Sequence, residues 1–210
     1  MTQAAAAPVT LRRALPPEEA ARGDFYALLG RLFHSAPDGL LLGRLAGASS
    51  LPAEGHPALA KAWQDLVDAS SVMDPDAAAE EYEQLFVGMG KAAVSIYAGF
   101  YTGAPSIAHP RVRLQGELAA LGLAHRGEVS EPEDHFAALF DVMRVLVAGG
   151  AGREPAALAE QKRFFQGYVE PAAAGFLRAV GAAPEANYYR AVALFGTAFL
   201  KLEAESFQLD

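Results

Sequence analysis

The sequence contains no cysteine among its 210 residues. This absence excludes disulfide bonds, zinc–thiolate sites, iron–sulfur ligation and catalysis by a cysteine nucleophile. It is consistent with a reducing compartment, where disulfides do not persist.

Basic residues are also scarce. The chain has 17 Lys and Arg against 25 Asp and Glu, which gives a formal net charge of −8. Without a basic run, such a chain has no electrostatic attraction to a phosphate backbone. We therefore expect no nucleic-acid partner, and the negative field favours a cationic one.

Long hydrophobic runs are missing too. The longest uncharged segment, residues 92–110, is interrupted by glycine and proline, which favours a loop over a membrane-spanning helix. Arg12 and Arg13 would suit an export signal, but prolines and glutamates follow where an apolar segment is required. We expect a flexible tail over residues 1–17, no transmembrane segment and a cytoplasmic protein.

No segment alternates apolar and polar residues in the way of a half-buried strand, and helical periodicity dominates. Asp74 before Pro75 is a typical helix start. The fold class predicted is all-α, with one domain over residues 18–210 and a compact bundle of about eight to ten helices. The expected helices cover roughly residues 18–34, 40–45, 59–67, 75–87, 110–123, 132–147, 154–180 and 184–205.

Residues 88–109 have no clean period. A loop of about twenty residues inside a compact domain is unusual and is often functional. Gly88 and Gly90 are typical of a helix stop, and the spacing does not match a phosphate-binding loop. The loop's aromatic side chains either pack against the core or line a groove for an apolar peptide. They are Tyr97, Phe100 and Tyr101.

The segment Glu131–Phe136 (EPEDHF) is the densest cluster of ionisable side chains. Ser130 and Glu133 have the S-x-x-E spacing of a capping box at a helix start. Acidic residues in a first turn are also favoured by the helix dipole. This reading predicts a capped helix from Pro132, with Asp134 and His135 at its solvent-exposed end.

Two chemical readings compete with the capped helix. A ferritin-like carboxylate site requires paired Glu-x-x-His motifs, and none is present. An acid–base pair of a hydrolase would use Asp134 and His135, but adjacent residues on a helix point about 100° apart. No nucleophile motif such as G-x-S-x-G accompanies them. We expect no metal, no cofactor and no catalytic residue.

Three sequence blocks together resemble the TorD/DmsD/NarJ family, the cytoplasmic chaperones that mature molybdenum-containing redox enzymes. Glu81–Gly90 (EYEQLFVGMG) is similar to the family's E-Y-x-x-L-F-x-G-x-G, and Tyr97–Tyr101 (YAGFY) to its Y-x-S-x-Y. Glu131–His135 (EPEDH), with Met143 eight residues further on, is similar to its E-P-x-D-H. The order and separation of the blocks agree over roughly residues 80–145.

The resemblance has departures. The serine of the tyrosine block is Gly99 here. In a later stretch the family has His and Trp where this chain has Tyr168 and Ala172. These differences leave the subfamily and the role of that stretch open.

The resemblance implies a TorD-like helical protein that binds the twin-arginine signal peptide of an apo molybdopterin oxidoreductase catalytic subunit. It would hold this client from export until the cofactor is inserted. Asp134, supported by Glu131 or Glu133, would face the arginines, and His135 would orient the carboxylate or contact the peptide. The peptide-binding set implied is Asp134, His135, Glu131, Pro132, Tyr82, Phe86, Tyr97 and Tyr101. The residues implied to maintain the motif are Leu85, Gly88, Gly90, Ser130, Glu133 and Met143.

Two alternatives remain. One is a NarJ-like chaperone that binds a client N-terminus without twin arginines, and the other is the hydrolase using Asp134 and His135. The oligomeric state implied is a monomer or a domain-swapped dimer, because relatives are of both kinds.

Overall fold

The computed structural model describes residues 15–88, 91–103, 110–123, 132–150 and 152–209. These ranges form helices and connecting turns, and no strand occurs within them. The only β-type pairings there are two isolated bridges, Tyr97 with His135 and Gly150 with Arg153. The helices are α1 (Pro17–His34), α2 (Gly39–Ala46), α3 (Pro57–Val72), α4 (Pro75–Tyr82), α5 (Pro110–Ala120), α6 (Phe136–Ala148), α7 (Leu158–Phe164), α8 (Glu170–Ala182) and α9 (Tyr188–Leu209). The predicted all-α bundle is confirmed.

Helices α1, α2 and α4 begin at residues whose local chemistry favours a helix start. Pro17 occupies the first position of α1 and glutamates fill its first turn. Asp38 caps α2 by accepting the amide of Leu41 at 2.8 Å. Asp74 caps α4 by accepting the amides of Asp76 and Ala77 at 2.9 and 3.2 Å.

Two predicted helices differ from the structure. The predicted helix over 154–180 is three segments: α7, a π-helical turn over Phe165–Val169 and then α8. Pro171 lies in the first turn of α8, where its missing N–H costs nothing. The predicted helix from Pro132 begins only at Phe136.

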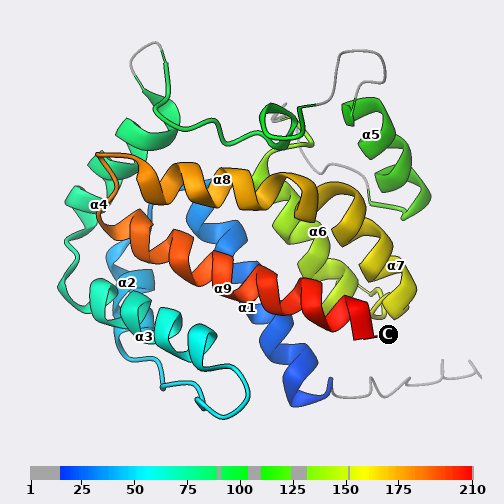
Figure 1. Cartoon of the computed structure of the whole chain (residues 1–210), viewed down its shortest axis with the longest axis horizontal. Coiled ribbons are helices and arrows are strands. Elements are labelled where there is room, and N and C mark those ends of the chain that lie inside the picture. The colour runs from blue at the N-terminus through cyan, green and yellow to red at the C-terminus, as the bar shows by residue number, and fades with distance from the viewer. Residues whose placement is uncertain (1–14, 89–90, 104–109, 124–131, 151, 210) are drawn as a thin grey trace, which may run out of the picture.

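Helices α8 and α9 run antiparallel across the front of the molecule in Figure 1, with α1 and α6 behind them. Helix α1 packs extensively on α6, and α9 packs on both α3 and α8. The core between these layers is strongly aromatic, and large aromatic side chains dominate the buried set. They include Tyr26, Phe33, Phe136, Phe140, Phe176, Phe195 and Phe199.

Length and apolar content together set what a helix must have to cross a bilayer. No helix in the described ranges is both long enough and apolar enough to cross a bilayer.

Candidate functional site

The three sequence blocks meet around one side chain of α8. The ring of Phe176 stacks on Phe136, which follows the EPEDH block, with centroids 4.0 Å apart. It also contacts Tyr101 of the second block at 5.9 Å and Phe86 of the first block at 6.3 Å. Phe176 lies outside all three motif blocks, so no local pattern indicates that it links them.

Gly88 turns the chain out of the first block. A π-helical turn over Glu83–Val87 follows α4, and Gly88 then adopts φ 64° and ψ 150°. These angles are available essentially only to glycine, and a Cβ there would collide with the carbonyl oxygen of Lys91. The returning chain donates the Val94 amide to the Leu85 carbonyl at 2.8 Å. The expected structural role of Gly88 is thereby explained, while Gly90 lies outside the described residues.

Asp134 holds the aromatic turn that carries the second block. Its carboxylate accepts the amide of Gly99 at 3.2 Å, and its backbone carbonyl accepts the amide of Ala98 at 2.8 Å. The residue is buried, with 8% of its surface exposed, so the expected solvent-exposed position was wrong. A Cβ on Gly99 would lie 3.0 Å from the Asp134 carboxylate. A serine in the family's position would therefore press on this contact here.

His135, not Ser130, caps the following helix. Its Nδ1 accepts the amide of Ala137 at 3.1 Å, and its ring packs edge-on against Tyr97 with centroids 5.6 Å apart. The residue is only 5% exposed, which again differs from the exposed position expected. Ser130 and Glu131 lie outside the described residues.

Glu133 does not serve the helix as a capping-box residue, since the helix starts three residues later. Its carboxylate accepts the side-chain amide of Gln115 on α5 at 2.7 Å. Pro132 is half-buried, and its carbonyl accepts the amide of His135 at 3.0 Å. Residues 132–135 therefore form a turn that contacts α5, the aromatic loop and the start of α6.

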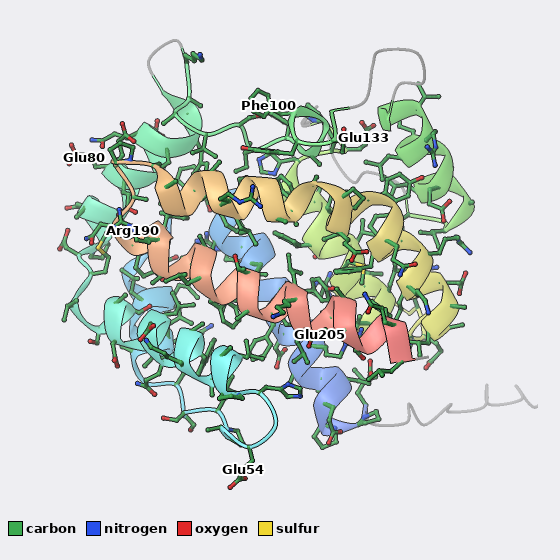
Figure 2. All side chains as sticks on the ribbon, viewed as in Figure 1. Glu54, Glu80, Phe100, Glu133, Arg190 and Glu205 are labelled. Atoms are coloured by element: carbon green, nitrogen blue, oxygen red, sulfur yellow. The ribbon has the colours of Figure 1, made fainter. Side chains whose placement is uncertain are left out.

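Two aromatic side chains reach the surface from this arrangement. Tyr97 is 38% exposed and Phe100 is 73% exposed. Phe100 and Glu133 both lie along the upper edge of the molecule in Figure 2. The surface formed by Tyr97, Phe100 and Glu133 is called the motif face below.

The other predicted aromatic residues support this face from inside. Tyr101 packs on Phe136 and donates its hydroxyl to the Ser95 carbonyl at 2.7 Å. Burial raises the pKa of Tyr101 to about 12. Tyr82 donates its hydroxyl to the carbonyls of Phe33 and His34 at the end of α1.

The remaining predicted motif residues lie in the core. Phe86 is buried against Phe33 and Tyr189, and Leu85 and Met143 have no exposed surface. Their side chains therefore anchor the motif blocks from within the bundle.

Glu81 was not predicted as a functional or structural residue, yet it has a well-defined role. Its buried carboxylate accepts the amides of Asn187, Tyr188 and Tyr189 at 2.8, 3.0 and 2.8 Å. These amides lie at the start of α9, where the helix itself provides no acceptor for them. The first motif block therefore ties α4 to α9 across 106 residues of sequence. Local pattern cannot reveal such a contact.

Surface hollows lie apart from the motif face. One of about 610 Å³ is lined by Gln84, Gly88 and Glu185 among others. Another of about 350 Å³ lies between α1 and α6. Within the described ranges, no three His, Asp or Glu side chains are grouped so that they could hold a metal ion.

Comparisons with known proteins agree with the sequence resemblance. The family model described as nitrate reductase delta subunit matches residues 53–178. The crystal structure of a protein from Archaeoglobus fulgidus, assigned as a redox enzyme maturation protein, has the same fold with a TM-score of 0.55. That alignment has 17% sequence identity and covers 94% of this chain and 98% of the other. A comparison with curated protein sequences finds no match.

The family match covers more than half of the chain and includes all three motif blocks. The chain therefore belongs to the nitrate reductase delta subunit family, the NarJ/TorD-type chaperones of redox enzyme maturation.

Proposed function

We propose that this chaperone binds the twin-arginine signal peptide of an apo molybdopterin oxidoreductase catalytic subunit. Binding would delay export in the cytoplasm until the cofactor is inserted. The observation that supports this most is the motif face, where Tyr97 and Phe100 are exposed although an apolar core lies directly beneath them. Large exposed apolar side chains on an ordered turn are typical of a binding surface.

The chemistry of the peptide matches this face. A signal peptide of this class carries paired arginines followed by an apolar, helix-forming segment. Arg stacks on aromatic rings and pairs with carboxylates, and Phe100, Tyr97 and Glu133 offer both. The net charge of −8 adds long-range attraction.

The energetics require both kinds of contact. Micromolar affinity corresponds to about 8 kcal/mol, and burying roughly 300–400 Å² of apolar surface supplies about that much before ordering costs. Ordering a flexible peptide takes back several kcal/mol. Aromatic burial alone is therefore insufficient, and paired charges must contribute.

The residues divide into two groups in this proposal. Tyr97, Phe100 and Glu133 contact the peptide, and Glu131 supplies a further carboxylate. Asp134 and His135 act as positioning residues, because their hydrogen bonds hold the aromatic turn and the start of α6. Tyr82, Phe86 and Tyr101 support the same turn from the core.

Titration calorimetry with the client's signal peptide tests these roles. Tyr97→Ala and Phe100→Ala should each weaken binding at least tenfold, about 1.4 kcal/mol, with little change in unfolding temperature. Leu194→Ala on α9 is the matched control, because Leu194 is 53% exposed and lies outside the motif blocks. Unchanged affinity in both aromatic variants would contradict the site.

A second candidate is a client N-terminus that lacks twin arginines. The family model's own description, nitrate reductase delta subunit, favours it. Co-purification of the client after deletion of its signal segment would support this reading over the first. In either case we propose a monomer or a domain-swapped dimer, without a catalytic role.

A further inference from the structure

Helix α5 (Pro110–Ala120) lies at one edge of the molecule, beside α7 in Figure 1. It turns one apolar stripe inward, because Leu114 and Leu121 are buried and Leu118 is partly buried. These positions are spaced i, i+4 and i+7, as on a helix seated on an apolar surface. The opposite side is exposed, with Val112 at 63%.

Besides this apolar stripe, α5 is held by polar contacts, one of which is the bond from the Arg153 guanidinium to the Leu121 carbonyl just after the helix. Arg163 of α7 donates to Glu117 through Nε and Nη2 at 3.0 and 2.8 Å, and the arginine side chain is 57% exposed. Tyr168 donates its hydroxyl to the carbonyl of Arg113 at 3.3 Å. Exposed ion pairs contribute little to stability, and water can replace a bond to a helix carbonyl. Helix α5 is therefore held more weakly than the helices of the aromatic core.

A further bond links α5 to the motif face. Gln115 donates to the Glu133 carboxylate at 2.7 Å. Displacing α5 would remove the Gln115 donor from the Glu133 carboxylate, where a cationic donor of the client could take its place. The position of α5 and the state of the motif face are thus coupled.

The sequence of α5 has the chemistry expected of the client. Arg111 and Arg113 precede a segment, LQGELAALGLA over residues 114–124, whose single charge is Glu117. A pair of basic residues followed by an apolar helix is the pattern that the proposed function assigns to the bound peptide. The chain therefore contains a segment that resembles its own ligand.

We infer that α5 is an autoinhibitory helix that occupies the position of the client's apolar helix. It lies against α7 and the π-helical turn over Phe165–Val169, where Arg163 and Tyr168 contact it, and the client's helix displaces it. This inference rests on the proposed function and adds its regulation. The client's affinity is then set partly by the equilibrium between seated and displaced α5.

A crosslink that fixes α5 tests this displacement. The variant Glu117→Cys/Arg163→Cys introduces the only two cysteines of the chain, because the native sequence has none. A short bismaleimide reagent joins them where the ion pair was. The probe is a synthetic peptide with two adjacent arginines followed by an apolar helix-forming segment.

The crosslinked protein should bind this probe at least tenfold more weakly than the same double variant before crosslinking. Before crosslinking, the variant should bind as tightly as the native protein or more tightly, since the ion pair between Glu117 and Arg163 is lost. Lys61→Cys/Asp65→Cys on α3, treated with the same reagent, is the matched control and should bind unchanged. Circular dichroism of each protein checks that the fold is retained.

Equal binding before and after crosslinking of Glu117→Cys/Arg163→Cys would overturn the autoinhibitory role and leave the proposed function intact. Absence of binding in every form, the native protein included, would overturn the proposed function and this inference with it.

Discussion

At the residue scale, the carboxylate of Glu81 connects two distant helices. It is 6% exposed and accepts three amides at the start of α9, at 2.8 to 3.0 Å. Hydrogen bonds to a charged acceptor are stronger than neutral ones. The glutamate of the first motif block therefore stabilises the fold. Its presence in the family motif is explained by this role, without any contact with a client.

Replacing Glu81 with alanine should lower the free energy of unfolding by about 2–4 kcal/mol, because buried donors at a helix start lose their acceptor. Urea unfolding measures this change. Glu80→Ala is the matched control: Glu80 is exposed and its carboxylate accepts the exposed side-chain amide of Gln84, so its removal should cost under about 0.5 kcal/mol. Similar losses in both variants would contradict the capping role.

Asp134 and His135 show what sequence spacing can and cannot reveal about a site. Asp134 and His135 lie beside the aromatic turn of the motif face, which Asp134 contacts at Gly99 and His135 at Tyr97. Their burial could not be predicted, because the amides that donate to the carbonyl and carboxylate of Asp134 belong to Ala98 and Gly99, in a loop far earlier in the chain. The capping box also matched in spacing, yet His135 caps the helix instead.

At the element scale, a buried ion pair joins α1 to α9. Arg22 donates to both carboxylate oxygens of Glu203 at 2.7 and 2.9 Å, and Tyr26 donates to the same carboxylate at 2.9 Å. Burial alone lowers the pKa of Arg22, but Glu203 and Glu19 outweigh it and raise the pKa above its ordinary value. The arginine also lies over the Phe207 ring at 5.5 Å.

Glu203→Ala should lower the free energy of unfolding by about 2–4 kcal/mol, because buried Tyr26 loses its acceptor and the partly buried Arg22 is left with Glu19 as its carboxylate partner. Chemical unfolding followed by circular dichroism measures the loss. Glu205→Ala, whose carboxylate is exposed and lies 3.8 Å from Lys201, should change stability by less than about 0.5 kcal/mol. A cost for Glu203→Ala no greater than that of the control would show that the ion pair does not hold the two helices together.

Element starts were the most predictable part of the fold. Proline and aspartate at helix N-termini act within a few residues, so α1, α2 and α4 begin as predicted. The π-helical turn over Phe165–Val169 was not predictable, because the apolar pattern continues through it. Its π-helical geometry depends on packing such as the contact of Phe165 with Phe207 at 5.2 Å.

At the scale of the whole molecule, buried tyrosines make stability sensitive to alkali. Burial raises the pKa of Tyr26, Tyr188 and Tyr189 above the ordinary value of 10, and that of Tyr101 to about 12. A raised folded-state pKa means that the unfolded chain loses its protons first. The associated stability is therefore present below about pH 10 and is lost as pH rises above it.

The free energy of unfolding should stay level up to about pH 10 and fall between about pH 10 and 12. Urea titrations at a series of pH values, with tyrosinate absorbance as a second signal, measure this. Tyr101→Phe should make the fall shallower, because Phe has no proton to lose. A flat profile across the window would contradict the burial of these hydroxyls.

The most direct test of the proposed function is calorimetric titration with two peptides that differ only at the paired arginines. The native peptide should bind with micromolar affinity, about 8 kcal/mol. Replacing both arginines with glutamine should weaken binding at least tenfold at low salt, and less at high salt, where the charges are screened. Equal affinity for the two peptides, or no binding of either, would contradict recognition of the twin-arginine signal.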